Sequence, residues 1–456
     1  MTDLAPERAA DLAAVPLARA YLAGEADPIA VTEVLLDRIA AAQSDAVYLT
    51  VTAERARREA RSAKARYDAG RPASGLDGVS IAWKDLFDMS GEVTTAGSAL
   101  WRNASPAEDD CPVVAHLAAA GMVALGKVNM TEFAFSGLGL NPHYGTPANP
   151  HDKETPRIPG GSSSGSAVAV ASGLATAAIG SDTGGSVRIP AAVNGIVGYK
   201  SSEGRISTEG ATPLSFTLDT VGPLARTVED CVHLDAALRG TAPTVARGHI
   251  AGMRLILSET LWLDDCEDAV TDAFEQAVKR LEKAGVTVET RTVPQIGEAA
   301  RVMADHGTLA NAESYFYHQE RMESADAEEM DGRVVARILR GKTMTAQDVL
   351  MNQRMRAKLS AQIAADMEDA FLIGPTVPRV APEIAPLDAD PDEFGRVNLL
   401  MLRNTMTGNF LNLPGVAMPM ASPSPLPVSF LISAKSNDDE RLLSAALAIE
   451  AIVRGD

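Results

Sequence analysis

Short apolar runs and helix-like stretches alternate along the whole chain, and no linker-like seam interrupts them. Residues 79–83 (VSIAW) and 121–130 (GMVALGKVNM) are typical of short buried strands. Residues 267–284 carry apolar side chains at helical spacing, Gly285 ends this predicted helix, and the following VTVET indicates a strand. This alternation predicts one large α/β domain.

The other segments extend the pattern. Residues 1–70 look helical, with Val31, Leu35 and Ile39 at every fourth position. The remaining expectations are a loop at 145–159, a tightly packed helix at 167–172, mostly helical structure at 301–370, a proline-rich loop at 374–395 and a late core strand at 426–434.

The 456-residue chain has a formal net charge of −19, which argues against a nucleic-acid partner because such binding needs a lysine- and arginine-rich face. Its N-terminus lacks the basic and apolar regions of a signal peptide, and no stretch reaches the roughly 18 apolar residues of a membrane-spanning helix. Three scattered cysteines argue against a disulfide framework. We therefore expect a cytoplasmic protein that binds neither membrane nor nucleic acid.

Residues 121–128 (GMVALGKV) have the glycine and lysine spacing of a phosphate-binding loop. Val128 stands where serine or threonine would hold magnesium, and the apolar residues between the glycines favour a strand over an anion-binding loop. We interpret this segment as a core strand.

Residues 161–165 (GSSSG) match the GxSxG pattern of a nucleophile elbow, with Ser163 at its centre. Such an elbow needs a strand directly before it, whereas a proline-containing loop precedes this one. The seven histidines form no HxH, HExxH or HxxE pairing, so we expect no metal site.

Two glycine–serine clusters, at 160–167 (GGSSSGSA) and 180–191 (GSDTGGSVRIPA), are flanked by apolar sequence. Glycines allow several backbone N–H groups to converge on one point, as an oxyanion requires, although a pair of flexible loops is the alternative. Lys84 follows the predicted strand VSIAW, and an apolar setting lowers the pKa of a lysine. Asp85 would oppose that shift, but neighbours in a strand point to opposite faces.

The segment from 159 to 200 resembles the signature of the amidase signature family, and the likeness extends to GVSIAWKDLFD, LGKVNMTEFAFSGLGL and GPLARTVED. It fades between about 290 and 370. The resemblance implies a single α/β domain over 1–456, with a central mixed β-sheet covered by helices on both faces. Within it we expect an N-terminal helical region at about 1–70, a signature core at about 75–240 and a variable, substrate-facing region at about 290–400.

Members of this family use a Ser–cisSer–Lys triad. Matched motif to motif, the resemblance implies that Ser186 is the nucleophile, Ser162 the bridging serine after a cis Gly161–Ser162 peptide, and Lys84 the base. Ser164 stands where many members have glycine, beyond the catalytic position.

The resemblance also implies the surroundings of the triad. The expected oxyanion hole consists of the backbone N–H groups of Thr183, Gly184, Gly185 and Ser186. The expected acyl pocket is lined by Ala134, Phe135 and Ser136. We expect Asp182 and Arg188 to act as a structural frame around the turn, and further pocket walls around 130–140, 301–340 and 375–405.

The predicted activity is hydrolysis of a small-molecule carboxylic amide through an acyl-enzyme on Ser186, with no cofactor and with a homodimer as a possible assembly. One alternative is the A subunit, or glutaminase, of a tRNA-dependent amidotransferase, although such subunits usually run longer at the C-terminus. The other alternative is an inactive scaffold of the same fold.

Overall fold

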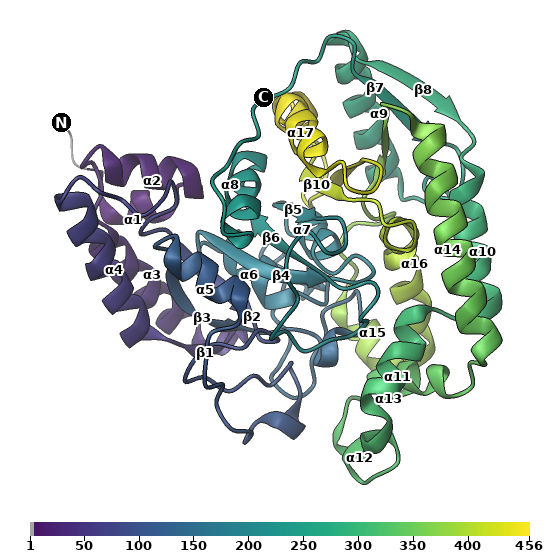
Figure 1. The fold of residues 1–456 in the computed structure, drawn as a ribbon, viewed down its shortest axis with the longest axis horizontal. Coiled ribbons are helices and arrows are strands. Elements are labelled where there is room, and N and C mark those ends of the chain that lie inside the picture. Colours follow the sequence, from purple (N-terminus) through teal and green to yellow (C-terminus); the bar gives the residue numbers. More distant parts are fainter. Residues whose placement is uncertain (1–3) are drawn as a thin grey trace.

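The computed structural model describes residues 4–456, and the strands of that part form one eleven-stranded sheet (Figure 1). Strands β2, β3 and β4 run parallel, as do β7, β8 and β9, and the remaining pairs are antiparallel, so the sheet is mixed as predicted. In sheet order the strands are β1 (Tyr48–Val51), β3 (Val123–Val128), β2 (Ser80–Lys84), β4 (Ala177–Asp182), β6 (Thr220–Ala225), β5 (Val197–Lys200), β10 (Gly415–Pro419), β11 (Ser429–Ser433), β9 (Phe371–Pro375), β7 (Arg254–Ser258) and β8 (Thr287–Arg291).

Helices surround this sheet (Figure 1). Those of the first half are α1 (Pro6–Ala10), α2 (Ala14–Leu22), α3 (Pro28–Ala41), α4 (Ala53–Asp68), α5 (Pro112–Ala119), α6 (Ser164–Ala171), α7 (Arg188–Val193) and α8 (Val228–Leu238). Those of the second half are α9 (Asp268–Lys283), α10 (Pro294–His306), α11 (Leu309–Met322), α12 (Asp326–Glu329), α13 (Gly332–Lys342), α14 (Ala346–Met367), α15 (Ile384–Ala389), α16 (Pro391–Phe410) and α17 (Asp439–Arg454). Short 3₁₀ turns lie at η1 (Gln43–Asp45), η2 (Ala99–Trp101) and η3 (Glu132–Ala134).

Alternate residues of the strands enter separate hydrophobic cores. Ile81 and Trp83 of β2 lie in a core with α5, α8, α9 and α17, whereas Ala82 lies in a core with α1 to α4 and α6. At the other end of the sheet, Ile256 and Leu372 lie in a core with α10, α14 and α16. Since neighbouring strand residues point to opposite faces, helices cover both faces of the sheet, as the resemblance implied.

Two expectations were incomplete. The region 1–70, whose first three residues lie outside the described part, contains the edge strand β1 besides its helices. The expected loop at 374–395 is wrong from Ile384 onward, where α15 and then α16 begin. Pro391 occupies the first turn of α16, where its missing N–H costs nothing, and Asp390 caps the helix by accepting from the N–H groups of Asp392 and Glu393.

The lengths and compositions of the helices bear on the question of membrane insertion. In the part of the chain that the structure describes, none of them is both long enough and apolar enough to cross a bilayer.

The predicted strands around 79–83, 121–130 and 426–434 correspond to β2, β3 and β11, and the predicted helix at 267–284 corresponds to α9.

Candidate active site

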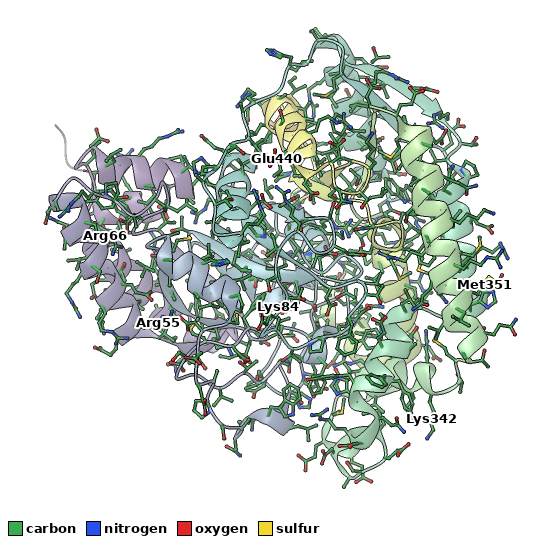
Figure 2. All side chains as sticks on the ribbon, in the orientation of Figure 1. Arg55, Arg66, Lys84, Lys342, Met351 and Glu440 are labelled. Carbon is green, nitrogen blue, oxygen red and sulfur yellow. The ribbon has the colours of Figure 1, made fainter. Side chains whose placement is uncertain are left out.

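Lys84 is the last residue of β2 and lies near the middle of the molecule (Figure 2). Its side chain is fully buried. The Nζ atom donates hydrogen bonds to Ser162 Oγ at 2.7 Å and to Ser181 Oγ at 2.9 Å. The structure therefore brings together two of the predicted catalytic residues, from segments far apart in the sequence.

The setting of Lys84 favours a neutral amine. Burial lowers the pKa of Lys84 to about 7, although the nearby carboxylates of Asp219 and Asp182 oppose the shift. A lysine with such a pKa is partly deprotonated at neutral pH and can accept a proton.

Asp85 faces a different environment from Lys84, as the strand geometry predicted. Its carboxylate forms a buried ion pair with Lys127 Nζ at 2.8 Å and accepts a hydrogen bond from the N–H of Thr95 at 3.1 Å. Lys127 lies in β3, all of whose residues are buried. The phosphate-loop-like segment is therefore a core strand, and its lysine neutralises a buried carboxylate.

The first glycine–serine cluster places Ser162 two residues before the start of α6, and Ser163 is the N-cap residue of that helix. The Gly161–Ser162 peptide bond is cis, as the resemblance implied. The N–H of Ser163 donates to the carbonyl of Ser186 at 3.3 Å, which joins this cluster to the second one. The Ser163 hydroxyl instead points to the carbonyl of Ser181 at 3.4 Å and is fully buried, which does not suit a nucleophile.

The second cluster is a tight turn between β4 and α7, built around the carboxylate of Asp182. That carboxylate accepts from the N–H groups of Gly185 at 2.8 Å and Val187 at 3.1 Å, and from Asn409 Nδ2 at 2.9 Å. It also receives Nε and Nη2 of Arg188, both at 3.0 Å, and both charged residues are fully buried. These contacts agree with a framing role for the pair.

The charge of Asp182 is maintained by its partners. Burial alone would raise the pKa of Asp182, but the Arg188 guanidinium and the more distant Lys200 outweigh burial and hold that pKa well below its usual range. The turn is therefore fixed by an ionised carboxylate.

The four amides predicted for the oxyanion hole are not equivalent. The Gly185 N–H already donates to Asp182. Within residues 4–456, the N–H groups of Thr183, Gly184 and Ser186 have no protein acceptor. Three donors are therefore free to bind an oxygen atom beside Ser186, whose hydroxyl likewise has no hydrogen-bond partner in the described residues.

Two residues of this site were missed by sequence reasoning. Ser181 is the second partner of Lys84, and its position inside the second cluster could have drawn attention to it. Asp219, whose pKa burial raises to about 6, accepts a hydrogen bond from Thr183 Oγ1 at 2.5 Å. Nothing in the local sequence around Asp219 indicates this contact.

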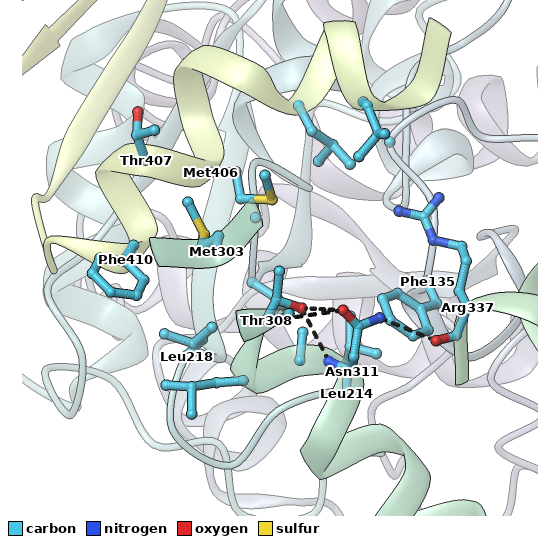
Figure 3. A pocket seen from close by; sticks show the side chains of 18 of the residues that line it. Phe135, Leu214, Leu218, Met303, Thr308, Asn311, Arg337, Met406, Thr407 and Phe410 are labelled. Carbon is cyan, nitrogen blue, oxygen red and sulfur yellow. Dashed lines mark hydrogen bonds between the residues drawn. The ribbon is translucent and has the colours of Figure 1, made fainter. Parts of the chain in front are cut away.

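A cavity of about 480 Å³ opens beside Ser186 (Figure 3). Besides Ser186, its walls include Ala134, Phe135 and Ser136, so the predicted acyl-pocket residues do face the predicted nucleophile. Asn398 of α16 holds this wall, because its Oδ1 accepts from Ser136 Oγ at 3.1 Å. Most of the other lining is apolar. It comes from the loops before β6, after β7 and between α13 and α14, and from α10, α11 and α16: Leu214, Leu218, Leu261, Met303, Leu309, Met344, Leu399, Leu402, Met406 and Phe410.

The carboxylate of Glu313 connects α11 to the loop before β6, and both contribute to the cavity wall. Glu313 of α11 accepts hydrogen bonds from Ser215 Oγ at 2.5 Å and from the N–H of Thr217 at 3.0 Å. These contacts tie the loop that carries Leu214 and Leu218 to α11. No histidine lines the cavity, and no group of three or more His, Cys, Asp or Glu among residues 4–456 is arranged to hold a metal ion.

The sequence and the fold of this chain are similar to those of known proteins. A family model described as amidase matches residues 30–443. The 2-amino-5-chloromuconic acid deaminase of Comamonas testosteroni is 33% identical over 416 residues, which cover 89% of this chain and 88% of that protein. The A subunit of the glutamyl-tRNA(Gln) amidotransferase of Azotobacter vinelandii is 34% identical over 469 residues, covering 94% and 95%. The crystal structure of an amidase superposes with a TM-score of 0.85 at 28% identity, covering 97% of this chain and 99% of that one. The family model matches nearly the whole length of the chain, and the structure contains the buried lysine and the two glycine–serine clusters that the sequence motifs predicted. This chain therefore belongs to the amidase signature family.

Proposed function

We propose that this protein hydrolyses the C–N bond of a linear carboxylic amide, with Ser186 as nucleophile, Ser162 as bridging serine and Lys84 as base. The observation that carries the proposal is the contact of 2.7 Å between Lys84 Nζ and Ser162 Oγ in a fully buried setting. That setting lowers the pKa of Lys84 to about 7, so the amine is available as a proton acceptor near neutral pH.

The reaction begins with two linked proton transfers. Neutral Lys84 takes the proton of Ser162, and Ser162 takes the proton of Ser186, whose oxygen attacks the amide carbon. The C–N bond then breaks, and the leaving nitrogen receives a proton through Ser162. Water hydrolyses the resulting ester by the same route, which releases the acid and restores all three residues.

The tetrahedral intermediate carries a negative oxygen that needs donors. We assign this role to the free N–H groups of Thr183, Gly184 and Ser186, and we assign the Gly185 N–H to the support of the turn through Asp182. Loss of one donor of this kind costs roughly 3 kcal/mol of transition-state stabilisation.

The second candidate is the A subunit of a tRNA-dependent amidotransferase, favoured by the identity of 34% to such a protein over 95% of its length. An A subunit would act as a glutaminase and pass ammonia to a partner. Purification together with a co-expressed B-type partner, and ammonia release from glutamine that depends on it, would support this candidate over a free-standing amidase.

Labelling with a fluorophosphonate tests the nucleophile, because this reagent reacts with activated serines. We expect Ser186→Ala to abolish both labelling and ammonia release from a panel of aliphatic and aromatic amides. Ser163→Ala is the matched control, and it should leave labelling intact. Labelling that survives in Ser186→Ala and disappears in Ser163→Ala would contradict the proposal.

A further inference from the structure

Asp219 lies directly before β6, opposite Thr183 at the end of β4. The two strands are antiparallel, and Asp182 of β4 pairs with Thr220 of β6, so Thr183 and Asp219 are the next residues beyond the paired ends. Cross-strand neighbours of this kind have their side chains on the same face of the sheet. The Thr183 hydroxyl accordingly donates to Asp219 Oδ1 at 2.5 Å. The register of two strands thus places a carboxylate against a residue of the expected oxyanion hole.

The other carboxylate oxygen of Asp219 holds a wall of the cavity beside Ser186. Asp219 Oδ2 accepts from the N–H groups of Leu214 at 2.9 Å and Ser215 at 3.1 Å. Leu214 lines that cavity (Figure 3). One carboxylate therefore connects Thr183, whose N–H is free to bind an oxyanion, to a loop that borders the cavity.

Asp219 also lies on the face of the sheet that carries the amine of Lys84. Ser181 and Thr183 are two positions apart, so their side chains point to the same face. Ser181 Oγ accepts from Lys84 Nζ at 2.9 Å, while Thr183 donates to Asp219. Ser181 and Asp219 also share the lining of a second, smaller cavity of about 240 Å³. The carboxylate is therefore close to Lys84, although the two form no direct ion pair in the described part of the chain.

Two carboxylates act on Lys84, those of Asp219 and Asp182. Asp182 is paired with Arg188, and Lys200 is a second cation near it. Asp219 has no such partner within residues 4–456, and the charge of Lys84 favours its ionised form. Burial raises the pKa of Asp219 to about 6, below the pKa of about 7 for Lys84, so the carboxylate is charged in the range where Lys84 titrates. That negative charge favours the protonated amine and opposes the effect of burial.

Two further carboxylates lie near the site without acting on the base. Asp85 is paired with Lys127 of β3 at 2.8 Å. Glu313 of α11 accepts hydrogen bonds from the same loop that Asp219 holds. The pKa of Lys84 contains no contribution from either carboxylate. Glu313 is therefore a matched control for Asp219.

We propose that Asp219 is a positioning residue of the catalytic site. One of its oxygens orients the Thr183 amide that binds the oxyanion, the other fixes the adjacent cavity wall, and its negative charge determines how readily Lys84 gives up a proton. This inference rests on the proposed function, because it takes Ser186 as the nucleophile and Lys84 as the base.

The readout is the rate constant of fluorophosphonate labelling of Ser186 as a function of pH, which requires no known substrate. In the wild type it should rise with pH as Lys84 becomes neutral. Asp219→Asn removes a negative charge near the ammonium group, so the proton is lost more easily. We expect the midpoint of the rise to move to lower pH by about 0.5 to 1 pH unit. A residue with a purely structural role would lower the rate without moving the midpoint.

The variants Thr183→Val and Thr183→Ser test the link to the oxyanion hole, because valine lacks the hydroxyl that donates to Asp219 and serine keeps it. The negative oxygen that develops on phosphorus needs the same N–H donors as an amide oxyanion. We expect Thr183→Val to lower the maximal labelling rate about 10-fold more than Thr183→Ser does. The midpoint should move less in Thr183→Val than in Asp219→Asn, since Asp219 keeps its charge. Equal maximal rates in the two Thr183 variants would overturn the positioning role.

Glu313→Gln is the control variant, because it removes a negative charge that contacts the same loop but does not act on Lys84. Whatever its effect on the rate, it should leave the midpoint in place. A shift as large as that in Asp219→Asn would overturn the inference.

Lys84→Ala separates the two possible failures. A rise with pH that persists in Lys84→Ala would contradict the proposed function, and the inference with it. A rise that depends on Lys84 but keeps its midpoint in Asp219→Asn would overturn the inference alone. If Asp219→Asn does not fold, Asp219→Ser, whose hydroxyl can still accept from one N–H of the loop, takes its place. If neither folds, the two Thr183 variants decide.

Discussion

The behaviour of one residue, Lys84, determines whether the proposed chemistry is possible. A lysine on a protein surface is protonated at neutral pH and cannot act as a base. Lys84 is fully buried at the end of β2, with two serine hydroxyls as its hydrogen-bond partners and with Asp85 directed to Lys127 instead. Lys84 forms no direct ion pair with any of residues 4–456, and this is what allows burial to lower the pKa of Lys84.

If Lys84 is the base, kcat/KM should rise with pH through about 7 and then level off, because only the neutral amine accepts a proton. Lys84→Ala should remove this rise and lower the rate by about 100- to 10,000-fold, the usual contribution of a general base. Lys84→Arg should be as damaging, since a guanidinium stays protonated. The pH–rate profile of each variant is the measurement, and a nearly wild-type Lys84→Arg would assign Lys84 an electrostatic role.

At the scale of structural elements, the turn between β4 and α7 needs a glycine more strictly at position 185 than at position 184. Gly185 has a φ of +134°, and a Cβ atom there would lie 2.2 Å from Thr405 Oγ1 of α16. At Gly184 the nearest atom to an added Cβ would be 3.5 Å away, an ordinary contact. The turn therefore packs against α16 at one position and borders the cavity at the other.

This difference predicts unequal effects of the same substitution. Gly185→Ala should shift the turn and misdirect the neighbouring N–H groups, with a loss in kcat of roughly 100-fold or more. Gly184→Ala keeps its N–H and should cost only a few-fold, mainly in KM. Steady-state kinetics on any amide that the wild type hydrolyses would measure both, and equal losses would show that the backbone conformation at 185 is not what limits the rate.

At the scale of the whole molecule, the burial of Lys84 lowers the free energy of unfolding. Lys84 is protonated in the unfolded chain up to a pKa of about 10.5 but only below about 7 in the folded protein. Between these values the unfolded state binds more protons, so the free energy of unfolding should rise with pH as far as this residue is concerned.

Replacing the lysine should remove that dependence. We compare the free energy of unfolding of Lys84→Met with that of wild type at each pH. The difference, variant minus wild type, should be about 2 kcal/mol larger at pH 7 than at pH 9. The loss of hydrogen bonds to Ser162 and Ser181 offsets part of the gain at both pH values equally. Urea denaturation at the two pH values measures the difference, and Lys342→Met, which removes a lysine from an exposed position, serves as the control. A difference that does not change with pH would mean that Lys84 is charged in the folded protein.

The sequence alone determined the α/β class, the core strands around Lys84 and Lys127, and the family whose motifs carry Lys84, Ser162 and Ser186. Periodicity, turn chemistry and motif spacing are properties of contiguous residues, so they can be recognised without a structure. The edge strand β1 is short and only partly buried, and α16 begins with a proline that resembles a loop signal, so these elements were not recognised.

Only the tertiary structure decided which distant groups meet. It showed that Ser181 shares Lys84 with Ser162, that Asp182 already engages the Gly185 amide, and that α10, α11, α13 and α16 enclose the cavity. Burial and charge pairing depend on contacts between residues far apart in the chain, and local sequence patterns do not predict these contacts.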